Sequence, residues 1–321
     1  SAAVAHAQKQ RRLPPDAYVV LTHEDKASGD RRVGAYVSGV RGFSTVSYYI
    51  EGPSGVILID TQFQPSATEE ALRWIEMATG KKVVLAVVLH ANPDKFNGTG
   101  VLKKRGIRVV TSAQVRALIP HIHEIRKASF YERYQPDYPA EYTLPDSFGD
   151  KTTELQAAGL TLKAHVLGAG CSESHVVVEF DGHIFAGDLV ANGAHSWLEI
   201  GRTDEWLKRL DEMQALKPLY VHPGRGASGD GRLLTQQASY LKFVIAAVAA
   251  EKPRLTTDGK LDAAAEKALE RVQAKLEERY PAYRYTVFLD IGLPAEWRRQ
   301  AQAPAATPKT PTPAVAAPAP R

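Results

Sequence analysis

Four short segments of the sequence contain histidine, aspartate, cysteine and basic residues of the kinds that bind metals or transfer protons. They are residues 89–98 (LHANPDKFNG), 168–175 (GAGCSESH), 185–190 (FAGDLV) and 220–226 (YVHPGRG). Each segment follows or ends a short apolar run that is typical of a strand. Loops at strand ends can bring together side chains that lie far apart in the sequence. We therefore expect the four segments to form one site.

The order of these segments resembles that of the metallo-β-lactamase-fold superfamily. In that family the first loop reads HxHxDH, the second GH before a small polar turn, the third GD, and the fourth PGHG or HPG. Residues 55–61 (GVILIDT) also look like the family's early strand, and residues 186–198 resemble its exported metallo-hydrolase branch. The resemblance covers about residues 45–226. It implies a four-layer αβ/βα sandwich that carries a hydrolytic metal site.

The chemistry of this family explains the spacing of its first loop. Alternating imidazoles supply two ligands to one zinc ion, and the following Asp-His pair reaches a second ion. The two cations lower the pKa of a bridging water and polarise the bond to be broken. In this chain His90 and Asp94 keep their positions. Two histidines are replaced, one by Asn92, whose amide oxygen is a poor zinc ligand, and one by Lys95, whose ammonium group cannot ligate until it loses its proton.

The other three segments depart from the family pattern to different degrees. Cys171 replaces the histidine of the second loop and is a competent zinc ligand as a thiolate, while Asp188 keeps the bridging-carboxylate position. The last histidine position has two candidates. Arg225 fills it if residues 223–224 align with PGHG, and His222 fills it if HPG is the better guide. The sequence leaves both open.

These substitutions change the charge of the expected site. Asp94 and Asp188 repel each other unless a cation lies between them, and two former ligand positions now carry Lys95 and Arg225. A cationic side chain can replace a metal ion in keeping buried carboxylates ionised. We therefore expect the second metal site to be converted into an ion-pair network.

Three hypotheses remain for what is left of the first site. One zinc or other divalent metal binds through His90 and Cys171 with Asp188 or His222, or Cys171 is a nucleophile with His90 as its base. In the third, Cys171 only fills space and no metal binds. If the site is catalytic, the candidate catalytic residues are Asp94, Lys95 and Cys171. The candidate substrate-binding residues are Asn92, Trp197 and Arg225, with Trp197 expected at the pocket rim.

Composition narrows the classes of function. The formal net charge is +4, and no basic run is long enough to indicate nucleic-acid binding. No apolar stretch approaches the roughly 18 residues of a membrane span. We thus expect a small-molecule partner. The first hypothesis is a hydrolase that acts on an ester, lactone or amide, although β-lactam hydrolysis is disfavoured because it needs an intact zinc site. The alternative is a non-catalytic binding or accessory protein that uses the same cleft as a ligand pocket.

Strand and helix patterns alternate along the chain in the way an α/β sandwich requires. Strands are expected at residues 18–22, 33–37, 45–51, 56–60, 83–89, 160–167, 175–180, 183–185 and 219–221. Helices are expected at 67–79, 113–134, 204–215, 231–250 and 261–279, with a further helix–strand unit at 98–111.

The two ends of the chain differ from this body in composition. We expect a flexible N-terminus at residues 1–15, one folded domain with a C-terminal helical extension at 16–300, and a disordered Ala/Pro-rich tail at 301–321. Residues 5–7 (AHA) have the small-x-small form of a signal-peptidase site, which favours export to a periplasm. The lone Cys171 excludes an internal disulfide.

The altered motif predicts that the protein binds fewer than two metal ions per chain. Asn92, Lys95 and Arg225 stand at three positions where the family pattern has ligands. Elemental analysis of the purified protein, after dialysis against zinc and then against metal-free buffer, measures this directly. Two tightly held transition metals per chain would contradict the prediction.

Overall fold

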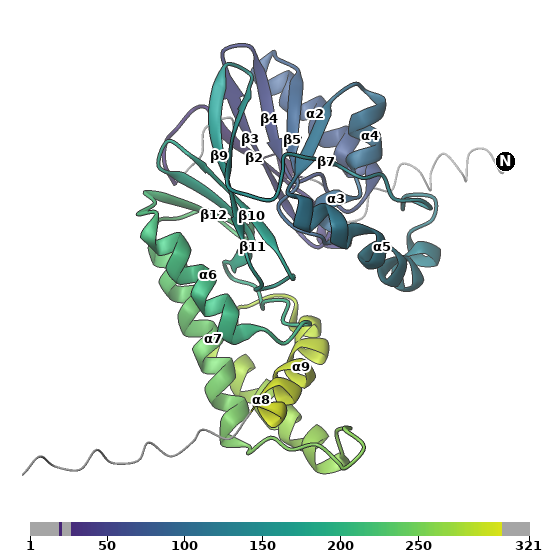
Figure 1. The fold of residues 1–321 in the computed structure, drawn as a ribbon, viewed down its shortest axis with the longest axis vertical. Coiled ribbons are helices and arrows are strands. Elements are labelled where there is room, and N and C mark those ends of the chain that lie inside the picture. Colours follow the sequence, from purple (N-terminus) through teal and green to yellow (C-terminus); the bar gives the residue numbers. More distant parts are fainter. Residues whose placement is uncertain (1–18, 21–26, 304–321) are drawn as a thin grey trace, which may run out of the picture.

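The fold consists of two β-sheets packed face to face, with helices on their outer sides (Figure 1). A computed structural model describes residues 19–20 and 27–303. The expected flexible N-terminus, with its signal-peptidase motif, and most of the expected tail lie outside the described residues. The arrangement confirms the predicted αβ/βα sandwich.

The first sheet has its strands in the order in which they occur along the chain. Its N-terminal strands pair antiparallel and its later strands pair parallel, with the change of direction at β4. The strands are β1 (Val19–Val20), β2 (Val33–Val37), β3 (Val46–Gly52), β4 (Gly55–Ile59), β5 (Val83–Val87), β6 (Arg108–Thr111) and β7 (Asp146–Ser147).

The second sheet has the order β12-β11-β10-β9-β8. All of its pairs are antiparallel except the β11–β12 pair, which is parallel. The strands are β8 (Thr153–Ala157), β9 (Leu160–Leu167), β10 (His175–Phe180), β11 (His183–Ala191) and β12 (Tyr220–Arg225).

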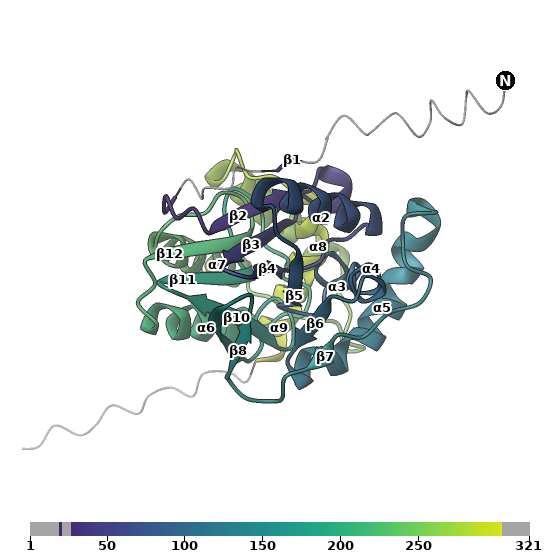
Figure 2. The same cartoon turned by 90° about the horizontal axis from the view of Figure 1, so that it is seen from above.

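The helices form two groups, and α3, α4 and α5 gather on the side of the molecule away from α6 and α7 (Figure 2). The helices that follow strands of the first sheet are α2 (Pro65–Thr79), α3 (Pro93–Phe96), α4 (Thr99–Lys104) and α5 (Ala113–Tyr134). Those of the second half are α6 (Thr203–Ala215), α7 (Arg232–Ala250), α8 (Ala263–Arg279) and α9 (Leu289–Gln302). Two short 3₁₀ helices, η1 (Val40–Gly42) and η2 (Thr286–Phe288), complete the elements.

Strands β10 and β11 of the second sheet are buried on both faces, as their near-continuous apolar sequences predict, whereas β8 and β9 leave alternate residues exposed. In β10, Val176 and Val178 belong to the core between the sheets, whereas Val177 points to a second core with α6 and α7. This second core includes Trp206 and Leu241, which are fully buried. Side chains on alternate faces of a strand thus join the two halves of the sandwich to the C-terminal helices.

Helix α7 is long and apolar enough to cross a membrane by length and composition alone. It packs in the second core, however, where Leu234, Leu241, Val244 and Val248 are buried. A buried core helix of a globular domain meets the same criteria, so α7 gives weak support for a membrane span.

The structure departs from the expected elements at three places that bear on the site. Strand β11 continues to Ala191 and β12 to Arg225, beyond the expected ends at residues 185 and 221. The missed part of β11 contains Gly187 and Asp188, residue types depleted in strands, and it is held by its parallel pairing with β12. Helix α9 was also missed, because Gly292 and Pro294 lower its helix propensity. It ends at Gln302, within the segment expected to be tail.

Candidate functional site

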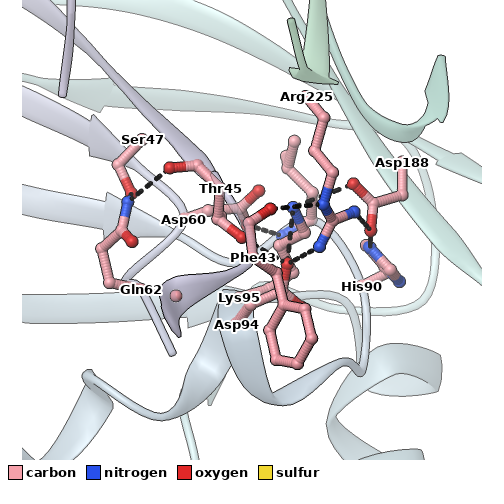
Figure 3. A network of polar contacts seen from close by, with 12 residues as sticks. Phe43, Thr45, Ser47, Asp60, Gln62, His90, Asp94, Lys95, Asp188 and Arg225 are labelled. Atoms are coloured by element: carbon pink, nitrogen blue, oxygen red, sulfur yellow. Dashed lines mark hydrogen bonds and ion pairs between the residues drawn. The ribbon is translucent and has the colours of Figure 1, made fainter. Parts of the chain in front are cut away.

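All four predicted segments meet at one end of the sandwich, and Figure 3 labels residues from three of them. The turn after β5 leads through His90 into the short helix α3, which carries Asp94 and Lys95. Asp188 comes from the extended part of β11, and Arg225 is the last residue of β12. All of these side chains are buried, and Lys95 has no exposed surface at all.

The carboxylate of Asp94 lies between both cationic side chains. Its Oδ2 accepts a hydrogen bond from Arg225 Nη2 at 2.7 Å and another from Thr45 Oγ1 at 2.7 Å. Lys95 Nζ lies 3.3 Å from the same oxygen. One carboxylate oxygen therefore contacts three donor groups from three parts of the chain.

The carboxylate of Asp188 is held in the same way. Its Oδ2 accepts a hydrogen bond from Arg225 Nη1 at 2.9 Å, and its Oδ1 lies 3.0 Å from Lys95 Nζ. His90 Nε2 lies 3.4 Å from Oδ2. The guanidinium of Arg225 thus bridges Asp94 and Asp188, while its Nε donates to the carbonyl oxygen of Phe43 at 2.8 Å. We call Asp94, Lys95, Asp188 and Arg225 the charge cluster.

Burial and pairing compete in setting the charges of this cluster. Burial raises the pKa of Asp94 and of Asp188, but Lys95 and Arg225 outweigh it and hold both below the usual range of a carboxyl. Burial likewise lowers the pKa of Lys95, and the two carboxylates more than offset this. The four groups are therefore ionised at neutral pH, with two charges of each sign.

A third buried carboxyl, Asp60, lies beside the charge cluster (Figure 3). It follows β4 with a φ of 65°, and its Oδ1 accepts a hydrogen bond from the backbone N–H of Leu89 at 2.8 Å. Burial raises its pKa to about 8, and the attraction of Lys95 only partly opposes this. Asp60 is thus mostly protonated at neutral pH, and the two cations remain matched to two anions.

The backbone of β12 approaches Asp188 so closely that one position requires glycine. A Cβ atom at Gly224 would lie 2.1 Å from Asp188 Oδ1, closer than any real contact. Any other residue at this position would push Asp188 away from Lys95. Because Gly224 of the PG pair has no side chain, Asp188 can lie close to Lys95 in the charge cluster.

A potential metal-binding group adjoins the charge cluster. Ligand atoms of His90, Cys171 and Asp188 lie within 4.8 Å of one another, and imidazole, thiolate and carboxylate all suit zinc. Both oxygens of Asp188 already contact cationic side chains. Burial also raises the pKa of the Cys171 thiol well above its usual value, which favours the neutral thiol over the thiolate that a metal or a nucleophilic role needs. In this arrangement the residues do not fit a two-metal site. Their donor types suit a single zinc ion, but the contacts of Asp188 and the raised pKa of Cys171 oppose its binding.

The structure places Arg225, and not His222, beside the carboxylates. His222 Nε2 lies 2.9 Å from His183 Nδ1, and its Nδ1 lies 2.7 Å from Ser228 Oγ. Both ring nitrogens therefore face partners outside the charge cluster. The backbone carbonyl of Asn92 accepts the N–H of Lys95 at 2.9 Å at the start of α3, so this residue helps to orient the lysine.

Aromatic rings from distant parts of the chain cover Arg225. Phe288 and Tyr285 lie with their ring centroids 5.4 and 6.0 Å from its guanidinium carbon, and Tyr285 OH lies 2.7 Å from Ser44 Oγ. The predicted rim residue Trp197 packs edge-on against Phe288 at 5.0 Å. Sequence reasoning missed Phe43, Tyr285 and Phe288, because aromatic residues without ligand spacing carry no motif signal.

Comparison with known proteins assigns this chain to a family. A sequence model described as the metallo-beta-lactamase superfamily matches residues 40–225, more than half of the chain, so the protein belongs to this superfamily of hydrolases. The predicted resemblance is thereby confirmed.

Individual relatives are distant. The metallo-beta-lactamase type 2 of Bacillus cereus is 25% identical over 201 residues, which cover 59% of this chain and 69% of the relative. That of Bacteroides fragilis is 26% identical over 187 residues, covering 55% and 67%.

Solved structures support the fold. A metallo-beta-lactamase from Pontibacter korlensis has a TM-score of 0.54 at 23% identity, covering 70% of this chain and 99% of its own. The FIM-1 enzyme from Pseudomonas aeruginosa, in its mono-zinc form, has a TM-score of 0.54 at 17% identity, covering 71% and 97%.

We predict that Arg225→Ala lowers the free energy of unfolding by about 3–5 kcal/mol, because it leaves two buried carboxylates with one cation. Urea unfolding at pH 7 measures the loss. Arg271→Ala is the matched control, since Arg271 pairs with Glu251 at the surface and its removal should change the unfolding midpoint little. A loss below about 1 kcal/mol for Arg225→Ala would show that the carboxylates do not depend on it.

We predict that Asp60→Asn removes a pH-dependent loss of stability. With a folded pKa of about 8 and an ordinary value of 3.8, wild-type Asp60 keeps a proton on folding between about pH 4 and 8. The unfolded chain has lost that proton, so the contribution of Asp60 to stability falls as pH rises through this window and is constant above it. The stability of the variant relative to wild type should therefore increase from pH 5 to pH 9 in urea unfolding. An unchanged difference would contradict the shifted pKa.

Proposed function

We propose that this protein is a metal-independent member of its superfamily, in which Lys95 and Arg225 take the place of metal ions and the former metal site is not catalytic. In this proposal the domain serves as a small-molecule binding or accessory protein. The observation that carries it is that Asp94 and Asp188 each contact both cations.

The charge balance of the cluster opposes a metal ion. Two carboxylates and two fixed cations sum to zero, so a divalent ion beside them would add two positive charges next to Lys95 and Arg225. Two unit charges of like sign about 4 Å apart repel by about 4 kcal/mol at an effective dielectric constant of about 20, and a divalent ion doubles this repulsion. Zinc would therefore have to displace at least one cationic side chain from Asp188.

The ionisation of the cluster also leaves little for acid–base catalysis. A general acid or base works best when its pKa lies near the pH of the reaction. The pKa values of Asp94 and Asp188 lie below this range, and those of Lys95 and Arg225 lie above it. A ligand that approaches this end of the sandwich would instead meet aromatic side chains, of which Phe43, Tyr285 and Trp197 are half-buried.

A second candidate function is hydrolysis of an ester, lactone or amide with one bound metal. The cluster of ligand atoms from His90, Cys171 and Asp188 favours it. It requires the thiol to lose its proton and Asp188 to give up a contact with Arg225 or Lys95. Metal titration therefore distinguishes the two candidates.

The test is the double variant Lys95→His, Arg225→His. Imidazoles at these positions restore ligands of the family pattern, so we predict that zinc affinity rises at least tenfold and that the melting temperature in chelator falls. Isothermal titration with zinc and thermal unfolding in EDTA measure the two effects.

Asp188→Asn in the same background is the control, because losing this carboxylate should cancel most of the gained affinity. If wild-type protein binds zinc as tightly as the double variant, and the double variant is as stable as wild type in EDTA, the proposal fails. The one-metal function would then be favoured.

A further inference from the structure

A second group of polar side chains forms a continuous hydrogen-bonded series away from the charge cluster. Asp30 Oδ2 lies 3.0 Å from His183 Nε2, and His183 Nδ1 lies 2.9 Å from His222 Nε2. His222 Nδ1 lies 2.7 Å from Ser228 Oγ. Asp30, His183, His222 and Ser228 thus form a relay of four groups, each within hydrogen-bond distance of the next.

The carboxylate of Asp30 sets the direction of the first hydrogen bond in the relay, and with a neutral His183 the directions of the others follow from it. Hydrogen bonds from Arg32 hold the pKa of Asp30 well below its usual value, so it only accepts, and His183 Nε2 must donate to it. In a neutral ring His183 Nδ1 then accepts from His222 Nε2. His222 Nδ1 in turn accepts the hydroxyl proton of Ser228. The relay therefore directs the proton of Ser228 toward His222 at the shorter of its two contacts, and Ser228 Oγ also lies 3.4 Å from Tyr48 OH.

The relay ends at the surface side of the fold. His183 and His222 are almost completely buried, whereas Ser228 is partly exposed. Ser228 lies in the segment 226–231 (GASGDG), which follows β12 and contains no large side chain. The small side chains of this segment leave Ser228 partly exposed to solvent.

We propose that Ser228 is the nucleophile of a metal-independent esterase site, with His222 as its base and activated acyl esters as its substrate class. Nucleophile, base and orienting group within hydrogen-bond reach are the arrangement that activates a serine. The proposal goes beyond the binding function proposed above, because it adds a separate catalytic site that uses none of the residues of the charge cluster.

His183 compensates for the low basicity of His222. Burial lowers the pKa of His222 to about 3, so it is a weak base by itself. As His222 Nδ1 takes the proton of Ser228, its Nε2 proton can pass to His183 Nδ1. The positive charge then resides on His183, beside the carboxylate of Asp30, and His222 remains neutral.

The reaction balances with water as the only co-reactant. Ser228 Oγ bonds to the acyl carbon, the bond to the leaving oxygen breaks, and the relay returns the proton to that oxygen. Water then attacks the acyl-serine, giving up a proton to the relay, and the carboxylic acid is released as Ser228 recovers its proton. Ser228 and His222 are the catalytic residues, and His183 and Asp30 are positioning residues.

The test uses the full chain in EDTA, so that zinc chemistry does not contribute. We expect an ethoxyphosphonyl fluoride probe to add once, with loss of fluoride, as measured by intact mass, and peptide mapping to place the adduct on Ser228. Ser228→Ala should abolish both the adduct and the release of p-nitrophenolate from p-nitrophenyl acetate. Ser129→Ala, which removes an exposed hydroxyl on α5, should leave both unchanged.

The relay is tested through Asp30. Asp30→Asn should slow phosphonylation at least tenfold, and Asp30→Glu should restore much of the rate, which a purely structural role would not predict. Absence of an adduct on wild-type protein would overturn the proposal. So would an adduct on Ser172, the serine whose Oγ lies 2.7 Å from His90 Nδ1. Neither result bears on the metal content of the charge cluster, so the two proposals fail independently.

Discussion

Two carboxylates buried in one protein interior need a cation between them, and much of the site is arranged around this requirement. Asp94 lies in α3 and Asp188 in β11, and Arg225 reaches both from the end of β12 while Lys95 reaches both from α3. A charge removed from water is tolerated only when it is paired and hydrogen-bonded. Three further features support this balance of charges. They are the close approach at Gly224, the hydroxyl of Thr45 and the protonated state of Asp60.

The layers and most elements could be predicted because their signals are local. Continuous apolar strands such as β5 and β10, and the long helix α5, depend on patterns that neighbouring residues carry. The extensions of β11 and β12 could not, since Gly187 and Pro223 oppose a strand locally and only their pairing across the sheet holds them. Local propensity gives way to tertiary pairing at these two positions.

The residue types of the site could be predicted from the sequence, but their arrangement in space could not. The motif indicated Asp94, Asp188 and two cations, but it left His222 and Arg225 as rivals for one position. These residues are three apart, so in a regular strand their side chains point to opposite faces, and only the register of β12 against β11 decides which one meets the carboxylates. The rings of Tyr285 and Phe288 that cover Arg225 come from a segment about sixty residues later in the sequence. That segment contains no recognisable motif.

The bridging position of Arg225 also restricts how such a protein can change over evolutionary time. Its guanidinium satisfies Asp94 and Asp188 together, so a mutation at any one of the three residues leaves a charge in the interior without its partner. Single substitutions at these positions are therefore expected to lower stability, and selection for stability opposes them. A descendant lineage is then free to change its surface and loops while this interior arrangement persists.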